Sequence, residues 1–341
     1  MKITIVDIAN KLDINPSTVS LALRDSPKIS AKTTALVKKT AEEMGYSRNP
    51  YVSALMSARR QGKTPDNPPG IAFITSSDTP EGWQEKYAST EFYAGSSNIA
   101  ASLGMKLESF WIGEKSMSAE RLNEILYNRG IQGAILLPTG THRHNMNHDW
   151  QHVAAVSYGI YDIAPGIDRV KADFYGNMEQ VISSLTEQGF SRIGYAMDTP
   201  YPYKNNNRWL AAYLMYTRDL SARKRLLPFL DEKPTAASFQ SWVEKQRPDV
   251  IICIDPVQVE KWLKQINCRV PEDVGLVTLG MARQGTSFSG IIENAATCGK
   301  IAMEMLLDRI HQNQFGTPDA PRYVTVRGLW NPGQTLSPPQ G

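Results

Sequence analysis

Four of the five histidines fall within one short segment, as His142, His144, His148 and His152. A spacing of four along a helix would place the last three on one face, where imidazoles hold zinc. The segment carries neither a cysteine nor an HExxH motif, and a polar loop with a short helix explains it more simply. We therefore predict no metal site and no cofactor.

Other catalytic motifs are missing as well. The sequence contains no GxGxxG, no GxxxxGK[ST] and no GxSxG, so neither a phosphate-binding loop nor a nucleophile elbow has support. Three cysteines without a CxxC pair are typical of a reducing cytoplasm. Apolar runs are too short for a membrane span, and Asp7 interrupts any secretory signal. We predict a cytoplasmic protein that is not an enzyme.

Polar side chains at the ends of apolar runs form a second candidate set. An arginine, a carboxylate and aromatic rings would suit a polyhydroxylated ligand such as a sugar. The candidate ligand contacts are Ser76, Asp78, Tyr87, Tyr158, Arg208 and Asp255, with Ser77, Trp83 and Trp209 beside them. Each has a structural alternative, because polar residues at strand ends often only cap helices and Trp209 can pack inside a core.

The elements that would position these residues alternate along the chain. Short apolar runs predict strands at residues 70–76, 106–113, 133–138, 152–159, 192–197, 249–255 and 274–280. Amphipathic segments predict helices at residues 90–103, 118–130, 173–189, 205–220, 256–266 and 295–313. Strands that alternate with helices indicate parallel doubly wound sheets, and two such runs indicate two lobes. Ligands of such folds bind at the carboxyl ends of the strands.

The N-terminal part differs from this body in charge. Residues 1–64 hold eleven Lys/Arg and five Asp/Glu, a net charge of +6, whereas the remaining residues carry −3. A solvated basic face would explain this imbalance as well as a polyanionic partner would.

Helix signals favour the polyanionic partner, and the alternative is that any small three-helix domain shows the same pattern. Thr4 and Asp7 form a capping-box pattern, Asn15 with Pro16 begins a second helix, and Ser30 begins a third. Val19, Ala22 and Leu23 would face inward from the second helix, and Leu36, Val37, Ala41 and Met44 from the third. Three short helices with a tight first turn predict a helix-turn-helix. Its second helix would present small polar residues to the major groove.

The segment "SRNPYVSALMSARRQGKTPDNPPG" follows, with Asn49 as a cap and Pro50 at the first helical position. A helix this short is marginal in water and would form on contact with a partner. Val52 and Leu55 share one face, where they could wedge into a minor groove.

Together, "ITIVDIANKLDINPSTVSLAL", "MGYSRNP" and "YVSALM" resemble the lac-repressor (LacI/GalR) family of bacterial transcription regulators. "VPEDVGLVTLG", "SGIIEN" and "RYVTVRGLWNPGQTL" resemble its effector domain, so the resemblance covers nearly the whole chain. It implies a hinge helix that folds on the operator and inserts Leu55, and an arginine, Arg208, that grips the effector. The DNA contacts it implies, together with those expected from the residues, are Thr4, Asn15, Pro16, Ser17, Thr18, Ser20, Leu21, Lys28, Asn49, Tyr51, Val52 and Leu55.

Several positions depart from that family. Asp13 replaces the usual turn glycine, Leu21 a common arginine, and Arg48 a proline. Gly280 and Met281 stand where the family carries an aspartate pair, so a ligand carboxylate is missing there. A Leu21 reader would favour a thymine methyl over guanine.

These observations predict a small all-α helix-turn-helix headpiece (residues 1–48), a hinge helix and linker (49–68), and an α/β two-lobed periplasmic-binding-protein-like effector domain (69–341). One lobe would hold about 69–163 and 294–320, the other about 164–293 and 321–341. The expected function is transcriptional regulation, as a repressor that binds a pseudo-palindromic DNA operator as a homodimer, or as a tetramer, under a carbohydrate-related effector. The alternatives are a periplasmic-type binding protein without a DNA role and a carbohydrate-active enzyme.

Overall fold

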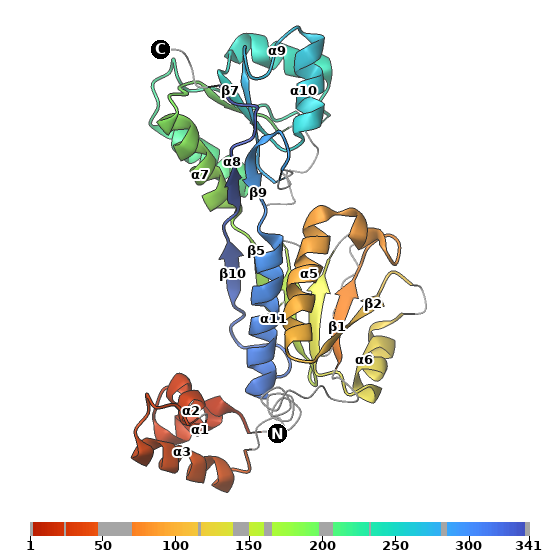
Figure 1. Cartoon of the computed structure of the whole chain (residues 1–341), viewed down its shortest axis with the longest axis vertical. Helices are drawn as coiled ribbons and strands as arrows, with labels where there is room; N and C mark the ends of the chain where they lie inside the picture. The colour runs from red at the N-terminus through yellow and green to blue at the C-terminus, as the bar shows by residue number, and fades with distance from the viewer. Residues whose placement is uncertain are drawn as a thin grey trace. The chain divides into compact units, whose positions relative to one another are not determined.

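A computed structural model describes residues 3–23, 25–46, 70–114, 117–138, 150–159, 166–197, 207–231, 233–280 and 285–337 (Figure 1). The chain divides into two compact units. The first holds Met1–Val170 with Ala296–Tyr323, and the second holds Lys171–Ala295 with Val324–Gly341. The chain therefore passes from one unit to the other three times.

The N-terminal helices are α1 (Ile5–Leu12), α2 (Pro16–Leu23) and α3 (Ala31–Glu43). Thr4 and Asp7 form the expected capping box, in which the Asp7 carboxylate accepts from the Thr4 backbone N–H at 2.8 Å. Asp13 ends α1 with a left-handed φ of 53°, so an aspartate fills a position that favours glycine. Ser30 caps α3 as predicted, and Gly45 follows that helix at φ 69°.

A small core joins these three helices. Its fully buried members are Ile8, Val19, Ala22 and Val37. The prediction for Leu36 is wrong, because this side chain is 52% exposed. Val37, Thr40, Ala41 and Met44 are spaced three and four apart and form the inward stripe, whereas Leu36 precedes that stripe by 100° of helical turn.

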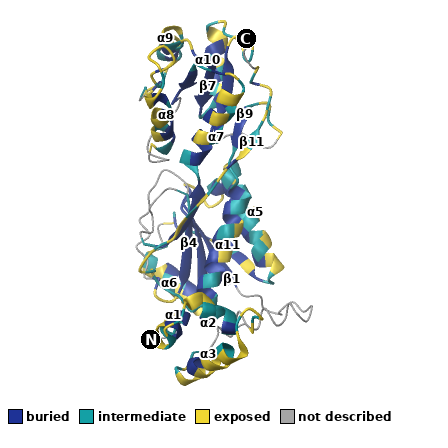
Figure 2. Ribbon diagram, turned by 90° about the vertical axis from the view of Figure 1, so that its left-hand side faces the viewer, coloured by how far each residue is buried: buried dark blue, intermediate teal, exposed yellow. Residues whose placement is uncertain are grey.

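The first unit contains most of a six-stranded sheet in the order β10-β5-β4-β3-β1-β2. Its strands are β1 (Gly70–Thr75), β2 (Lys106–Trp111), β3 (Gly133–Leu137), β4 (Ala154–Tyr158), β5 (Asp168–Ala172) and β10 (Tyr323–Val326). Neighbours from β2 through β5 pair in parallel. Its helices are η1 (Gly82–Glu85), α5 (Tyr87–Ser102), α6 (Ala119–Asn128) and α11 (Ala295–His311). Strands β1, β3 and β5 are buried along their whole length, so the middle of this sheet is dark in Figure 2.

Two glycines set the close approach of α5 and α11, which lie side by side in Figure 1. A Cβ at Gly95 would come within 2.0 Å of the Ala296 carbonyl oxygen, and one at Gly299 within 2.1 Å of the Phe92 carbonyl oxygen. Only glycine fits at either place, so the backbones of the two helices meet directly.

The second unit contains a five-stranded sheet in the order β11-β9-β8-β7-β6. Its strands are β6 (Ile193–Tyr195), β7 (Val250–Cys253), β8 (Gly275–Thr278), β9 (Ser289–Ile292) and β11 (Leu329–Asn331). The first four are parallel, and β11 pairs antiparallel with β9. Its helices are α7 (Phe174–Glu187), α8 (Arg208–Arg218), α9 (Ala236–Gln246) and α10 (Pro256–Gln265). Tyr195, Tyr213 and Phe239 are fully buried, so aromatic rings make up much of this core.

The strand β5 and the helix α9 are among the elements that have no counterpart in the predicted ones. In β5, Asp168, Arg169 and Lys171 are all buried although they are charged. Asp168 is held by Arg322, whose Nε and Nη2 donate to its carboxylate at 2.9 and 2.6 Å. Arg309, itself 4% exposed, adds a second cation at 3.8 Å. Ion pairing therefore compensates for the burial of the Asp168 carboxylate, which the apolar pattern did not indicate.

No helix within the described ranges is long and apolar enough to cross a bilayer.

Candidate functional site

The outer face of α2 is small and neutral. Val19 and Ala22 are fully buried, which turns the other side of the helix outward. Asn15 caps the helix, because its Oδ1 accepts from the Ser17 backbone N–H at 2.9 Å and from the Ser17 hydroxyl at 2.8 Å. Of the DNA contacts expected here, Asn15, Pro16 and Ser17 are exposed, while Thr18, Ser20 and Leu21 are half-buried. Such a face can approach base edges closely.

Cations lie around this helix rather than on it. Lys28 is exposed in the turn between α2 and α3. Lys38 pairs with Asp25 at 2.6 Å, although both side chains are about half exposed or more. The Thr4 hydroxyl donates to Asp7 at 2.8 Å, so its first role is to begin α1. Asn49, Tyr51, Val52 and Leu55, the expected hinge contacts, lie outside the described residues.

In the first unit, the expected ligand contacts gather at the carboxyl edge of the sheet. Ser76 and Asp78 follow β1, and Tyr158 ends β4. Both strands are neighbours of β3 in the sheet. Ser76 is 3% exposed, whereas Asp78 is exposed. The Tyr158 ring stacks on Phe92 at a centroid distance of 4.2 Å. Tyr87, the first residue of α5, is half-buried.

Two further candidates in this unit support the structure. Trp83 is 6% exposed and packs edge-on against Phe73 with centroids 5.3 Å apart. The Ser77 carbonyl oxygen accepts from the Trp111 indole at 2.7 Å. Trp83 is therefore a core residue of the first unit, which is the structural alternative for an aromatic side chain.

In the second unit, Arg208 and Asp255 begin the helices that follow β6 and β7. Because β6 and β7 are parallel, both residues come to the carboxyl edge of this sheet. Asp255 caps α10, with its Oδ1 accepting from the Gln258 backbone N–H at 3.1 Å. Trp209 is 7% exposed and packs edge-on against Phe174 at 5.1 Å.

Glu293, at the same edge, was missed from the sequence. It follows β9 by one residue, and burial raises the pKa of its carboxyl group to about 7. A Cβ at Gly280 would lie 3.0 Å from its Oε1. The signal was present in "SGIIEN", where a polar pair interrupts an apolar run at a strand end.

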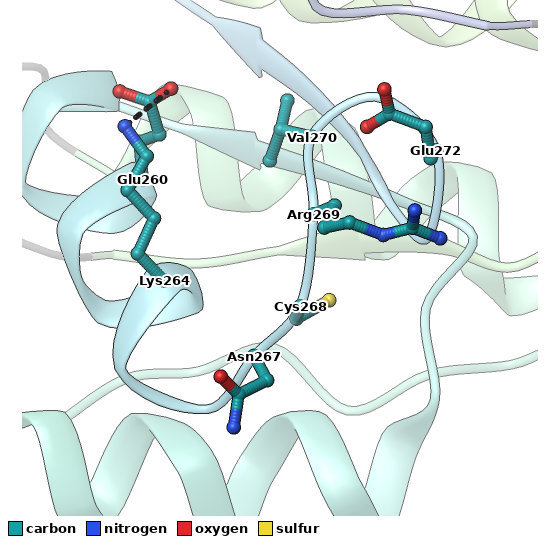
Figure 3. Close-up of a pocket in the computed structure, with 7 residues that line it drawn as sticks. All are labelled: Glu260, Lys264, Asn267, Cys268, Arg269, Val270 and Glu272. Carbon is teal, nitrogen blue, oxygen red and sulfur yellow. Dashed lines mark ion pairs between the residues drawn. The ribbon is translucent and has the colours of Figure 1, made fainter.

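A surface hollow of about 440 Å³ lies elsewhere on the second unit (Figure 3). It is lined by residues near the end of α10 and the following turn, at the opposite end of that helix from Asp255. Its cations are already paired, Lys264 with Glu260 at 3.2 Å and Arg269 with Asp273 at 2.9 Å. The hollow offers a ligand few charges that lack a partner.

Metal ligands do not cluster anywhere in the described part of the chain. Of the predicted histidine group, the structure describes His152 alone, whose ring lies 6.1 Å from that of Tyr127.

Comparison with known proteins agrees with this architecture. The family model of bacterial regulatory proteins of the lacI family matches residues 4–49, and that of the periplasmic binding protein-like domain matches residues 182–329. No curated protein matches the chain.

Several solved structures share the fold. The lac repressor dimer bound to operator and the anti-inducer ONPF is 17% identical, with a TM-score of 0.53 over 99% of this chain and 100% of that one. The transcriptional regulator CelR in complex with cellobiose is 16% identical, at 0.54 over 98% and 100%. A LacI-family regulator from Rhizobium etli, 16% identical, scores 0.60 over 79% and 99%. At these identities the structures show the fold alone.

Two family models match the chain, and its two units share the fold of solved LacI-family structures. The chain belongs to the lacI family of bacterial regulatory proteins, and it is a DNA-binding regulator with an effector-binding domain rather than an enzyme.

Proposed function

We propose that this regulator is a repressor that binds a pseudo-palindromic operator as a homodimer and responds to a carbohydrate-related effector. The observation that carries the proposal is α2: an Asn15-capped helix whose buried side is Val19 and Ala22 and whose outer side is Pro16, Ser17 and Leu21. One reading helix per protomer needs two-fold symmetry to reach both half-sites.

The side chains on and around α2 would contact different parts of the DNA. The neutral outer face of α2 would read base edges, and surrounding cations such as Lys28 would bind phosphates. Ser17 can donate to or accept from a base edge, whereas Leu21 offers only apolar contact, which favours a thymine methyl. The similar lac repressor structure is a dimer bound to operator, which supports the same arrangement here.

The effector part of the proposal is supported by the two polar strand edges. Ser76, Asp78, Tyr87 and Tyr158 would contact the effector from the first unit, and Arg208 and Asp255 from the second. Among structures of this fold, CelR binds cellobiose, and a CCPA regulator from Weissella paramesenteroides, 14% identical with a TM-score of 0.53, binds glucose. A carbohydrate-related ligand is therefore the class that we propose.

Coupling between ligand and DNA would run through the hinge. We propose a headpiece at 1–48, a hinge at 49–68 and an effector domain at 69–341, with lobes at about 69–163 with 294–320 and at about 164–293 with 321–341. The effector would change the spacing of the two hinge helices, so that paired Leu55 side chains no longer insert into the operator. The protein would act in the bacterial cytoplasm, where its DNA lies.

The test starts with selection of preferred sites from a random DNA library by the full-length protein. We expect a palindromic consensus, and we expect Leu55→Ala to weaken binding to that consensus more than binding to random DNA. Leu36→Ala is the matched control, because this exposed leucine lies on the solvent side of α3. Equal attachment to every sequence, or equal loss on both kinds of DNA for Leu55→Ala, would contradict the proposal.

A further inference from the structure

The side of α2 that faces away from the headpiece core is centred on Ser17 and Leu21. These two residues lie one helical turn apart, whereas Val19 and Ala22 on the opposite side are fully buried. Ser17 is exposed and Leu21 is half-buried. A base edge in the major groove would therefore meet a hydroxyl group and an apolar side chain first.

Neither guanine nor adenine finds its usual partner on residues 14–23. Guanine is most often bound by Arg or Lys, and this stretch contains no charged side chain. Adenine is bound by both ends of an amide, but Asn15, the one amide in the stretch, already accepts two hydrogen bonds from Ser17 at its Oδ1. Arg24, the next residue along the chain, lies outside the described residues. Hydroxyl and apolar groups are the contacts that this stretch has left to offer.

Leu21 is an apolar side chain that the headpiece core does not use. Leu21 and Leu23 are both half-buried, but of these two described residues only Leu23 packs against the buried cluster that includes Ile8 and Val19. Contact with an apolar group of a partner would remove the remaining surface of Leu21 from water, which is favourable. Leu21 is therefore placed for an apolar contact outside its own domain.

Unmodified DNA offers one apolar group in the major groove, the C5 methyl group of thymine. Cytosine carries only a hydrogen at the same carbon, and methylation there gives 5-methylcytosine the group that thymine has. The Ser17 hydroxyl gives its hydrogen to Asn15 at 2.8 Å, so towards a base it accepts. A T·A pair offers it the adenine amino group, and a methylcytosine·G pair offers it the cytosine amino group. The outer side of α2 thus fits both methylated pairs.

We propose that Leu21 recognises the C5 methyl group of a pyrimidine in each half-site, whichever pyrimidine carries it. Methylation of cytosine at that position then strengthens binding, as the methyl group of thymine does, and the regulator responds to a DNA modification as well as to its effector. This rests on the proposed function in taking α2 as the helix that enters the major groove.

The experiment uses the full-length protein and the DNA site that it selects from a random library. Each thymine is replaced singly by deoxyuridine, which removes the C5 methyl group and changes nothing else. At least one replacement should weaken binding by about fourfold, and the same change in both half-sites by about fifteenfold, the effect of losing one and two buried methyl groups. When that T·A pair becomes C·G, methylation of the cytosine should strengthen binding by the same factors.

Variants assign the effect to a side chain. Leu21→Ala should bring both methyl ratios close to one, while Leu21→Met, which keeps a long apolar side chain, should preserve them. Leu36→Ala, on the exposed side of α3, and Arg24→Ala are the matched controls and should keep both ratios. An apolar contact releases no counterion, so the ratios should be equal at about 50 and about 200 mM salt although the affinities fall.

Three results would overturn the assignment while the proposed function stands. They are a selected site in which no thymine methyl group affects binding, methyl ratios that persist in Leu21→Ala, and cytosine bound as tightly as 5-methylcytosine. If wild type prefers no DNA site at all, the proposed function fails and the assignment falls with it. Selection of a site followed by loss of the ratios in Leu21→Ala alone supports both.

Discussion

The helix α2 and the carboxyl edge of the second sheet present side chains of opposite character to their ligands. The outer side of α2 is small and uncharged, and it rests on a core of short helices in which Ile8 and Val19 are the deepest members. The edge presents Arg208, Asp255 and Glu293 above a core of aromatic rings. A helix that contacts base edges in the major groove must approach them closely, which small uncharged side chains allow. A site for a small ligand needs a few polar or charged groups held in fixed positions.

Because the two regions have separate cores, we expect the headpiece to unfold without the α/β units. Val19→Asp places a charge in the core of the headpiece, which should cost about 4 kcal/mol or more, enough to unfold so small a domain. DNA binding should disappear at any salt concentration, measured by fluorescence anisotropy. The main calorimetric transition of the α/β units should stay within about 1 °C of wild type.

Val6→Asp is the control for this change, because Val6 is 37% exposed on α1 and a charge there remains hydrated. DNA binding that survives Val19→Asp would show that the three-helix core does not position α2.

A second prediction concerns the edge and pH. The folded pKa of Glu293, about 7, lies above its ordinary value of 4.5, so protonation favours the folded state. The stability this provides is fully present below about pH 4.5 and is lost as pH rises through 7. The difference is at most about 3 kcal/mol. Denaturant unfolding between pH 5 and 8 should show a flatter profile for Glu293→Gln than for wild type, and identical slopes would contradict the raised pKa.

Much of this architecture is predictable from the sequence, for physical reasons. Capping chemistry is local, so Thr4 with Asp7 and Ser30 marked helix starts that the structure confirms. Apolar runs predicted the parallel strands from β1 to β4 and from β6 to β8, but neither β9 nor β5, whose buried Asp168 is paired with Arg309 and Arg322 from distant segments. Pairing across more than 130 residues leaves no trace in a local pattern.

The site was harder to predict than the fold. Arg208 and Asp255 could be placed because each begins a helix after a parallel strand. Glu293 could not, because it lies beside Gly280 only through the pairing of β8 with β9. The sequence showed that a carboxylate was missing after β8, and only the structure shows the Glu293 carboxylate beside that position.

A third prediction tests how much the reading helix depends on its cap. Asn15→Ala removes the acceptor of the Ser17 backbone N–H and should destabilise the headpiece by about 1 kcal/mol. Binding to the selected site should weaken by up to about tenfold, while the ligand response of the α/β units stays unchanged. Asn15→Ser keeps a capping oxygen and should recover most of the loss; no recovery would assign Asn15 a base contact instead.

The smallest expected effect distinguishes phosphate contacts from base contacts. Lys28 is exposed beside α2, and its loss should weaken binding to the selected site and to random DNA by the same factor. The slope of log affinity against log salt should fall by about 1 for each protomer, because one fewer counterion is released. Lys38→Ala is the matched comparison: Lys38 already pairs with Asp25 at 2.6 Å, so its removal should change the slope less. A larger slope change for Lys38 than for Lys28 would mean that the Asp25 pair opens on DNA and that the phosphate track follows α3 rather than the turn before it.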